Sequence, residues 1–252
     1  MARLPTIVLA LLPGLLASAQ GRLESAHPYG GMAALERLFA QEMNYPPAFL
    51  ETRKKGEVVV AVHVQGDGTV TNVQVLRPLH PACDAEALRL VRLVRWAPST
   101  AIEGRGGGEH YLSVPFDPGK YRRWARERPE RHAEVFELPA TAELMVHAPQ
   151  DLDTQVVPIV PGGNNGLGRH LAESMRYPEE ARRRSIEGTV VLEFTVEASG
   201  AVTNMYAVQE LGGGCTMEAM RLVERTPWAP GAKDGQRVRS SLRVSIGFAL
   251  PR

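Results

Sequence analysis

The chain of 252 residues has few cysteines, almost no net charge and no long apolar run after its first twenty residues. Two cysteines cannot form a disulfide framework or a cysteine-based zinc cluster. Lysine and arginine total 29 against 28 acidic residues, so the chain lacks the basic excess of nucleic-acid-binding proteins. The apolar share of 44% and charged share of 23% exclude collagen-like, coiled-coil and wholly disordered proteins.

The first nineteen residues have the layout of a secretory signal peptide. Arg3 precedes an apolar run from Leu4 to Leu16, and Ala17-Ser18-Ala19 gives a small-x-small cleavage pattern. A membrane-spanning helix needs about twenty apolar residues, and this run is shorter and contains two prolines. We therefore predict cleavage after Ala19 and an extracytoplasmic mature chain. An uncleaved segment would instead anchor the chain in the inner membrane.

The most informative feature is an internal repeat whose matching residues lie 132 positions apart. The matches are Tyr45-Pro46 with Tyr177-Pro178, Gly56 with Gly188, Gly68 with Gly200, Val70-Thr71-Asn72 with Val202-Thr203-Asn204, Cys83 with Cys215, and Trp96-Ala97-Pro98 with Trp228-Ala229-Pro230. A period this long, seen twice, is typical of tandem domains rather than a solenoid. We predict one domain at residues 30–118, a linker at 119–157 and a second domain at 158–252.

Each repeat predicts the order helix, strand, strand, helix, strand. The expected elements of the two copies are a first helix at 32–43 and 167–175, a hairpin with turns at 66–68 and 199–200, a second helix at 84–95 and 216–225, and a last strand at 111–116 and 241–248. In the second hairpin Glu193, Thr195 and Glu197 alternate with apolar residues, which predicts a polar, solvent-facing side. The fold class is therefore α+β, with two tandem domains, each a three-stranded antiparallel sheet with helices on one face.

A set of landmarks over about seventy residues of the second copy is typical of one protein family. The landmarks are Tyr177-Pro178, Glu179-Glu180-Ala181, Gly188, Gly200, Cys215, Glu218-Ala219, Trp228-Ala229-Pro230, Gly235 and Phe248. With them the second copy resembles the C-terminal domain of TonB-type energy transducers. The first copy is similar but more diverged, because its final loop contains Gly106-Gly107-Gly108 and lacks the family pattern.

The resemblance implies a periplasmic protein-interaction module in receptor-linked transmembrane transport. In the family, an outer-membrane receptor segment pairs with the edge strand of the domain. Such an edge has unpaired N–H and C=O groups that an extended peptide can satisfy. The corresponding residues here are Leu242, Arg243, Val244, Ser245 and Ile246, and the edge of the first copy is Tyr111 to Phe116.

An alternative reading is a structural envelope protein that reuses the fold. In that case the inter-domain segment or the other copy covers the two edges, through a domain–domain or homodimer contact. The inter-domain segment itself opens with basic and aromatic residues from Lys120 to His132, which suit an anionic surface or a solvated helix. Glu127 and Glu130 within it favour the solvated helix.

Three interpretations of Cys83 and Cys215 stay open. Each precedes a predicted helix, so it is a buried small residue, half of a Cys83–Cys215 disulfide, or a thiol activated by the helix N-terminus. The glycine-rich stretches lack the Gly-Lys-Ser/Thr of a phosphate loop, and no set of nucleophile, base and oxyanion donors is present. We therefore expect no enzyme activity, cofactor, metal, nucleic acid or small-molecule substrate.

Overall fold

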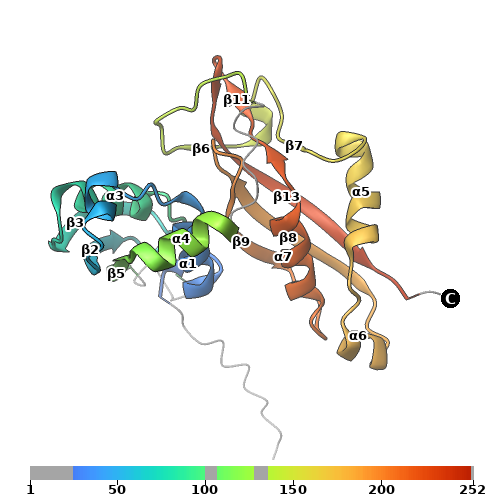
Figure 1. Cartoon of the computed structure of the whole chain (residues 1–252). Coiled ribbons are helices and arrows are strands. Elements are labelled where there is room, and N and C mark those ends of the chain that lie inside the picture. Colours follow the sequence, from blue (N-terminus) through green and yellow to red (C-terminus); the bar gives the residue numbers. More distant parts are fainter. Residues whose placement is uncertain (1–24, 100–106, 128–135, 251–252) are drawn as a thin grey trace, which may run out of the picture.

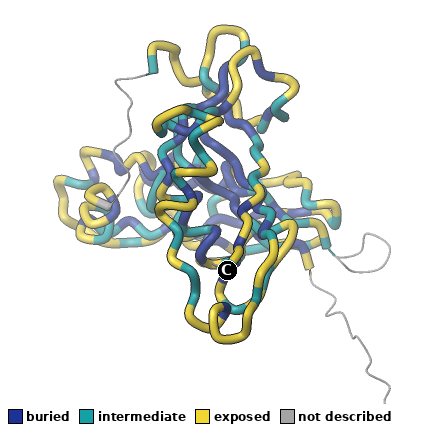
Figure 2. The backbone as a smooth tube through the Cα atoms, turned by 90° about the vertical axis from the view of Figure 1, so that its right-hand side faces the viewer, coloured by how far each residue is buried: buried dark blue, intermediate teal, exposed yellow. Residues whose placement is uncertain are grey.

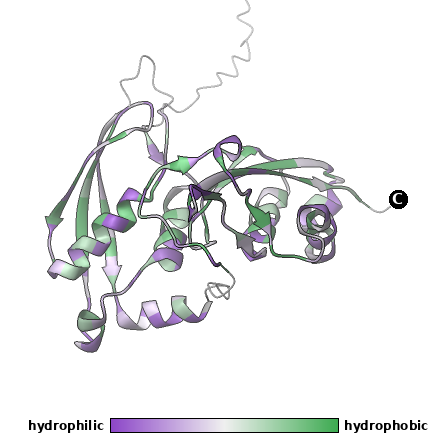
Figure 3. Ribbon diagram, turned by 90° about the horizontal axis from the view of Figure 1, so that it is seen from above, coloured by the Kyte–Doolittle hydropathy of each residue, from purple (hydrophilic) through white to green (hydrophobic). Residues whose placement is uncertain are grey.

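A computed structural model describes residues 25–99, 107–127 and 136–250. The predicted signal peptide and its cleavage site at Ala19 lie outside these residues. The chain forms two α+β units side by side, each built on an antiparallel sheet with its own buried core (Figures 1 and 3). The predicted fold class is therefore confirmed. No helix within the described ranges is long and apolar enough to cross a membrane.

The first unit follows the predicted order of elements. Its elements are β1 (His27–Pro28), α1 (Gly31–Glu42), α2 (Pro47–Glu51), β2 (Gly56–Val64), β3 (Val70–Arg77), α3 (Pro81–Arg92), β4 (Trp96–Ala97) and β5 (Gly108–Phe116). The sheet order is β3-β2-β5, so β2 is central. Its inward side chains at Val58, Val60, Val62 and Val64 are fully buried.

The second unit repeats this plan and adds strands. Its elements are β6 (Val146–His147), the 3-10 helix η3 (Pro149–Asp151), β7 (Val157–Pro158), α5 (Gly163–Ser174), α6 (Glu179–Arg183), β8 (Gly188–Val196), β9 (Val202–Gln209), α7 (Cys215–Arg225), β10 (Trp228–Ala229), β11 (Ala232–Lys233), β12 (Gln236–Arg237) and β13 (Arg239–Phe248). The sheet order is β6-β13-β8-β9, with the inter-domain strand β6 added at one edge. Figure 2 shows the buried strands at the centre and the exposed turns around them.

The glycines of the hairpin turns explain two landmarks of the repeat. Gly68 and Gly200 have φ values of 87° and 83°, in the left-handed region that favours glycine. A Cβ atom at Gly68 would lie 2.5 Å from the carbonyl oxygen of Trp96, and one at Gly200 would lie 2.7 Å from that of Trp228. The turn therefore packs directly on the backbone of the Trp-Ala-Pro step in both copies.

Several helix boundaries differ from the predicted ones. Helix α3 begins at Pro81 rather than Asp84, because the His80 side chain caps it by accepting from the Ala82 N–H at 3.2 Å. Helix α5 begins at Gly163, four residues before the first apolar position, Leu167. The short helices α2 and α6, which follow the Tyr-Pro steps, were not predicted.

The inter-domain segment contributes to both units. Helix α4 (Pro118–Glu127) packs on the first unit, where Trp124 is buried and Lys120 Nζ lies 4.7 Å from the centre of its ring. Arg122, Arg123 and Arg126 are exposed. The described part of this basic stretch is thus a helix with its aromatic side packed and its basic side solvated. Residues 136–158 pack on the second unit, where β7 pairs with β10.

Candidate functional site

Strand β13 carries the residues predicted to bind a partner strand. On one side it pairs with β8 from Ser240 to Phe248. On the other side it pairs only with β6, through Arg239 and Ser240. Within the described ranges, no strand pairs with this outer side of β13 from Ser241 to Phe248. The edge that the sequence predicts to bind a partner strand is therefore unpaired over most of its length.

The side chains of the predicted residues alternate between the two faces of the sheet. Ile246 is buried, and Leu242 and Val244 are half-buried against the second core. Arg243 and Ser245 are exposed on the opposite face. Arg243 Nη2 donates to Glu193 Oε2 at 2.7 Å, across to the neighbouring strand. An added strand would therefore meet apolar neighbours on one face and a charged, polar surface on the other.

Strand β5 is the corresponding edge of the first unit, but it contains a proline. Pro115 lies opposite Glu57 in the register of β5 with β2, and Gly247 lies opposite Thr189 at the equivalent place in β13. Proline has no N–H to donate and is tolerated in sheets at edges, with its nitrogen toward solvent. The edge of β5 consequently offers one donor fewer than the edge of β13.

Strand β9, the far edge of the second sheet, is covered by the first unit. Tyr29 stacks on Tyr206 with 4.1 Å between ring centres. A Cβ at Gly30 would lie 2.6 Å from the carbonyl oxygen of Met205, which shows how closely the two backbones approach. The first half of β9, from Val202 to Met205, is buried, whereas the equivalent β3 is mostly exposed. The two units thus make a domain–domain contact, and it covers β9 rather than β13.

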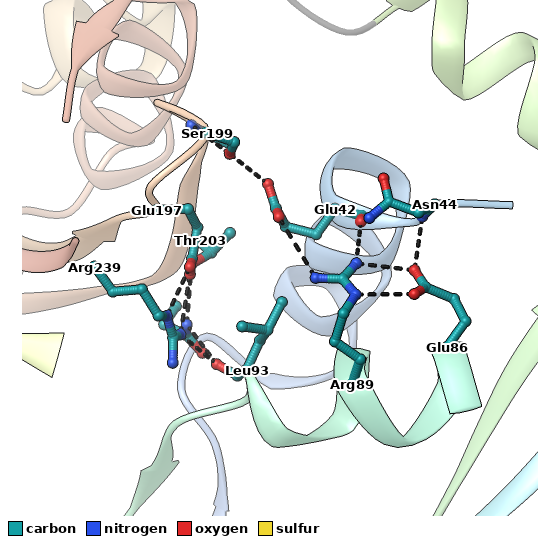
Figure 4. Close-up of polar contacts among 11 residues, drawn as sticks. Glu42, Asn44, Glu86, Arg89, Leu93, Glu197, Ser199, Thr203 and Arg239 are labelled. Carbon is teal, nitrogen blue, oxygen red and sulfur yellow. Dashed lines mark hydrogen bonds and ion pairs between the residues drawn. The ribbon is translucent and has the colours of Figure 1, made fainter. Parts of the chain in front are cut away.

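A buried ion pair forms the centre of this interface (Figure 4). Arg239 Nε donates to Glu197 Oε2 at 2.7 Å, and the two side chains are only 4% and 3% exposed. Arg239 also donates to the carbonyl oxygens of Leu93 at 2.8 Å and Leu144 at 2.6 Å. Burial raises the pKa of the Glu197 carboxyl, and Arg239 and the Thr203 hydroxyl oppose this shift. One guanidinium therefore connects the first unit, the inter-domain segment and the second unit.

Asn204 adds a second set of hydrogen bonds at the end of helix α3. Its Nδ2 donates to the Leu93 carbonyl at 3.1 Å, and its Oδ1 accepts from the Arg95 N–H at 2.8 Å. Carbonyls at a helix C-terminus have no partner within the helix. Asn204 and Arg239 supply one for Leu93 from the other domain. Asn204 takes a φ of 49° at a bulge of β9, a conformation that asparagine tolerates better than most residues.

A third cluster is repeated in both units. In the first unit, Glu86 accepts from the Asn44 N–H at 2.6 Å and pairs with Arg89, whose Nη2 donates to the Glu42 carbonyl at 2.5 Å. The second unit repeats these contacts with Arg176, Glu218, Arg221 and Ser174. The cluster ties the end of the first helix to the second helix, which explains the Glu-Ala landmark. In the first unit alone, Glu42 also accepts from Ser199 at 2.6 Å, across the interface.

The comparison with known families matches both units. The family described as the Gram-negative bacterial TonB protein C-terminal matches residues 41–116 and 173–250. The chain belongs to this family. Protein TonB of Pseudomonas putida is 38% identical over 64 residues, which are 25% of this chain and 26% of that protein. The chain thus spans about a quarter of the length of that relative.

Two solved structures of Helicobacter pylori TonB-CTD are also similar to part of this chain. The NMR structure of residues 179–285 is 22% identical, covers 35% of this chain and 80% of that one, and has a TM-score of 0.28. The NMR structure of residues 194–285 is 23% identical, covers 34% and 90%, and has a TM-score of 0.26.

The residues that form the interface between the two TonB C-terminal repeats were not foreseen from the sequence. Thr195 and Glu197 were expected on a solvent-facing side, but they are 0% and 2% exposed. The expectation was wrong because the first repeat covers that end of the sheet. The only signal in the sequence is a difference between copies, since Gln65 and Gly107 stand where the second repeat has Glu197 and Arg239.

The structure describes both cysteines as free thiols that are fully buried, one in each TonB C-terminal core. Burial raises the pKa of Cys83 to about 11 and also raises that of Cys215. Neither thiol is therefore activated by the helix whose first turn contains it. In residues 25–99, 107–127 and 136–250, no three histidine, cysteine, aspartate or glutamate side chains are placed to hold a metal ion.

We expect iodoacetamide at pH 8 to leave Cys83 and Cys215 unmodified in the native chain, because each is buried and protonated. Unfolding in guanidinium should expose both thiols to the reagent, which provides the control. Peptide mass spectrometry measures the modified fraction at each position. Rapid labelling of either cysteine in the native chain would instead indicate a reactive thiol.

Proposed function

We propose that this TonB C-terminal protein is a periplasmic interaction module of TonB-dependent transport. In this proposal it binds an extended segment of an outer-membrane receptor, or of another envelope protein, by adding it as a strand to β13. The observation that carries the proposal is the unpaired outer side of β13 within the described residues. An edge of this kind provides main-chain donors and acceptors for a partner, and the flanking side chains provide specificity.

The other sheet edges support the choice of β13. The first repeat covers β9, and Pro115 removes a donor from β5. In β13 the residue equivalent to Pro115 is Gly247, whose missing side chain leaves open space around the backbone. The second repeat therefore has the edge with fewer obstacles to strand addition, and the first repeat acts mainly as its support.

The surface beside β13 indicates which partner segment would bind best. Arg243 is exposed next to the open edge, and within the described part of the chain it forms an ion pair with Glu193 alone. Opposite charges on neighbouring strands stabilise their pairing, whereas like charges destabilise it. A carboxylate on the partner strand beside Arg243 would therefore be favoured. Apolar partner residues would face the half-buried Leu242 and Val244.

A structural role in the envelope is the second candidate function. It is supported by the contact that covers β9 and by β6, which occupies the first two positions of β13. In that case, the repeats would pack mainly on each other and the free part of β13 would bind nothing. Both candidates share the periplasmic location, which depends on the predicted signal peptide.

Photo-crosslinking in the native envelope distinguishes the two functions. A photoreactive residue in place of Arg243 should crosslink to the N-terminal segment of an outer-membrane receptor, identified by mass spectrometry. Crosslinks confined to residues of the chain itself would leave only the structural role.

The variant Gly247→Pro should weaken this crosslinking about five- to tenfold, because it removes a main-chain donor worth about 1 kcal/mol and adds a ring at the edge. The substitution copies the residue that the first repeat tolerates at the same place, so the fold should persist. Pro115→Gly is the matched control, and it should leave crosslinking from position 243 unchanged. Equal crosslinking in Gly247→Pro and the natural chain would exclude β13 as the binding edge.

A further inference from the structure

We propose that β6 is an internal strand that blocks the first positions of the β13 edge and is displaced when a partner binds. This inference rests on the proposed function, because it concerns the regulation of the same edge. Strand β6 lies on the outer side of β13, opposite β8, where an added strand would also lie. It pairs in parallel, Val146 with Arg239 and His147 with Ser240.

The contacts of β6 with β13 are few. The Ser241 hydroxyl donates to the His147 carbonyl at 3.3 Å, and Arg239 Nη1 donates to the Leu144 carbonyl at 2.6 Å. Two residues in a parallel pair form a short ladder, and parallel pairing is slightly weaker per residue than antiparallel pairing. The adjoining side chain of Met145 is 61% exposed, so it adds little buried area.

His147 reduces the stability of β6 further. Its side chain is 6% exposed, and its Nε2 atom is buried without a hydrogen-bond partner. A buried polar atom without a partner costs free energy that it regains in water. Release of β6 therefore returns this nitrogen to solvent. The same movement frees the outer side of β13 beside Arg239 and Ser240 for an incoming strand.

The inter-domain segment is held separately on both sides of β6, so β6 can leave without unfolding the segment. Before β6, Arg237 N–H donates to the Pro139 carbonyl at 2.8 Å and Thr141 N–H donates to the Arg237 carbonyl at 2.9 Å. After β6, the N–H groups of Asp153 and Thr154 donate to the Ala232 carbonyl at 2.9 and 3.1 Å. Between these anchors β6 pairs with the edge, and η3 is the other element that contacts β13.

Displacement of β6 lengthens the binding edge. With β6 in place the free stretch begins after Ser240, and without it the stretch begins at Arg239. A partner segment long enough to use the added positions gains main-chain pairs that a short segment does not. The inter-domain segment thereby selects for long extended segments, and it shields the edge from short ones.

The test uses the full chain with a photoreactive residue in place of Arg243 and a synthetic peptide of residues 140–149 as the probe. The variant Val146→Pro disrupts β6 and should increase crosslinking of this peptide at least about fivefold. A scrambled peptide should show no gain. Crosslinking that stays equal or falls in Val146→Pro would overturn the proposal. The experiment with the synthetic peptide does not require the envelope partner. If no receptor crosslink forms in the envelope, that result would therefore contradict the proposed function and not the role of β6.

Hydrogen exchange of the natural chain provides a second measurement that needs no substitution. The amides of residues 144–148 should exchange at least about a hundred times faster than those of β8, because β6 opens without global unfolding. A saturating amount of the same peptide should speed the exchange of 144–148, because it takes the place of β6 on β13. Protection of 144–148 equal to that of β8 would show that β6 is a fixed part of the sheet and would overturn the inference.

Discussion

Replacing Arg239 by methionine should lower the free energy of unfolding by about 3–5 kcal/mol at pH 7, since it leaves a carboxylate buried without its cation. Glu197 is 2% exposed, and within the described ranges it forms an ion pair with Arg239 alone. The same change removes the donors to Leu93 and Leu144, so the contact between the repeats should loosen as well. Denaturant unfolding followed by tryptophan fluorescence measures the loss.

The loss in Arg239→Met should shrink as the pH falls from 7 toward 5. Burial raises the pKa of Glu197 in the folded chain, so the folded state binds a proton at a higher pH than the unfolded state does. Stability then rises as the pH falls through the folded pKa toward the unfolded one. The double variant Glu197→Gln with Arg239→Met should lack this pH dependence and recover part of the loss. A pH-independent loss in the single variant would contradict the role given to Glu197.

Truncating Phe194 to alanine should also lower the free energy of unfolding by about 3–5 kcal/mol, because it opens a cavity in the second core. The Phe194 ring is fully buried and its centre lies 5.4 Å from that of Trp228. It also lies opposite Leu242 in the ladder with β13, so the cavity forms directly beneath the candidate edge.

Val191→Ala is the matched control for this variant. Val191 lies on the same strand with its side chain half-buried on the other face, so its truncation should cost less than about 1.5 kcal/mol. Unfolding of both variants in urea gives the comparison. Equal losses would mean that Phe194 is not the centre of the second core.

The parts of the fold that could be predicted are those whose residues have the same physical role in both copies. Gly68 and Gly200 allow the same close approach to a tryptophan carbonyl, and Glu86 and Glu218 hold the same helix end. Alternation of apolar residues located the hairpins and the edge strand β13. The start of α5 was missed because its first turn, Gly163 to Gly166, has no apolar side chain. The spacing of apolar residues that predicts a helix therefore begins only after this turn.

Which residues form the interface, and which part of the inter-domain segment occupies the edge, could not be predicted, because both depend on residues that differ between copies. A local pattern marks Glu197 as solvent-facing, and nothing near it in the sequence indicates that another domain covers it. Strand β6 has only two residues, too few for a period-two pattern. Both features arise from contacts between distant parts of the chain, which periodicity does not report.

The contact between α1 and β9 has a further consequence for a protein made of two similar domains. The duplication supplies a second pair of equivalent surfaces, α5 and β3, but their charges do not match. The ion pair of Arg37 with Glu224 corresponds there to Arg169 and Arg92, which would repel each other if the two surfaces met. A repeated head-to-tail contact would otherwise join chains into an open filament. At this pair of positions the divergence of the two copies therefore disfavours a repeat of the contact between chains.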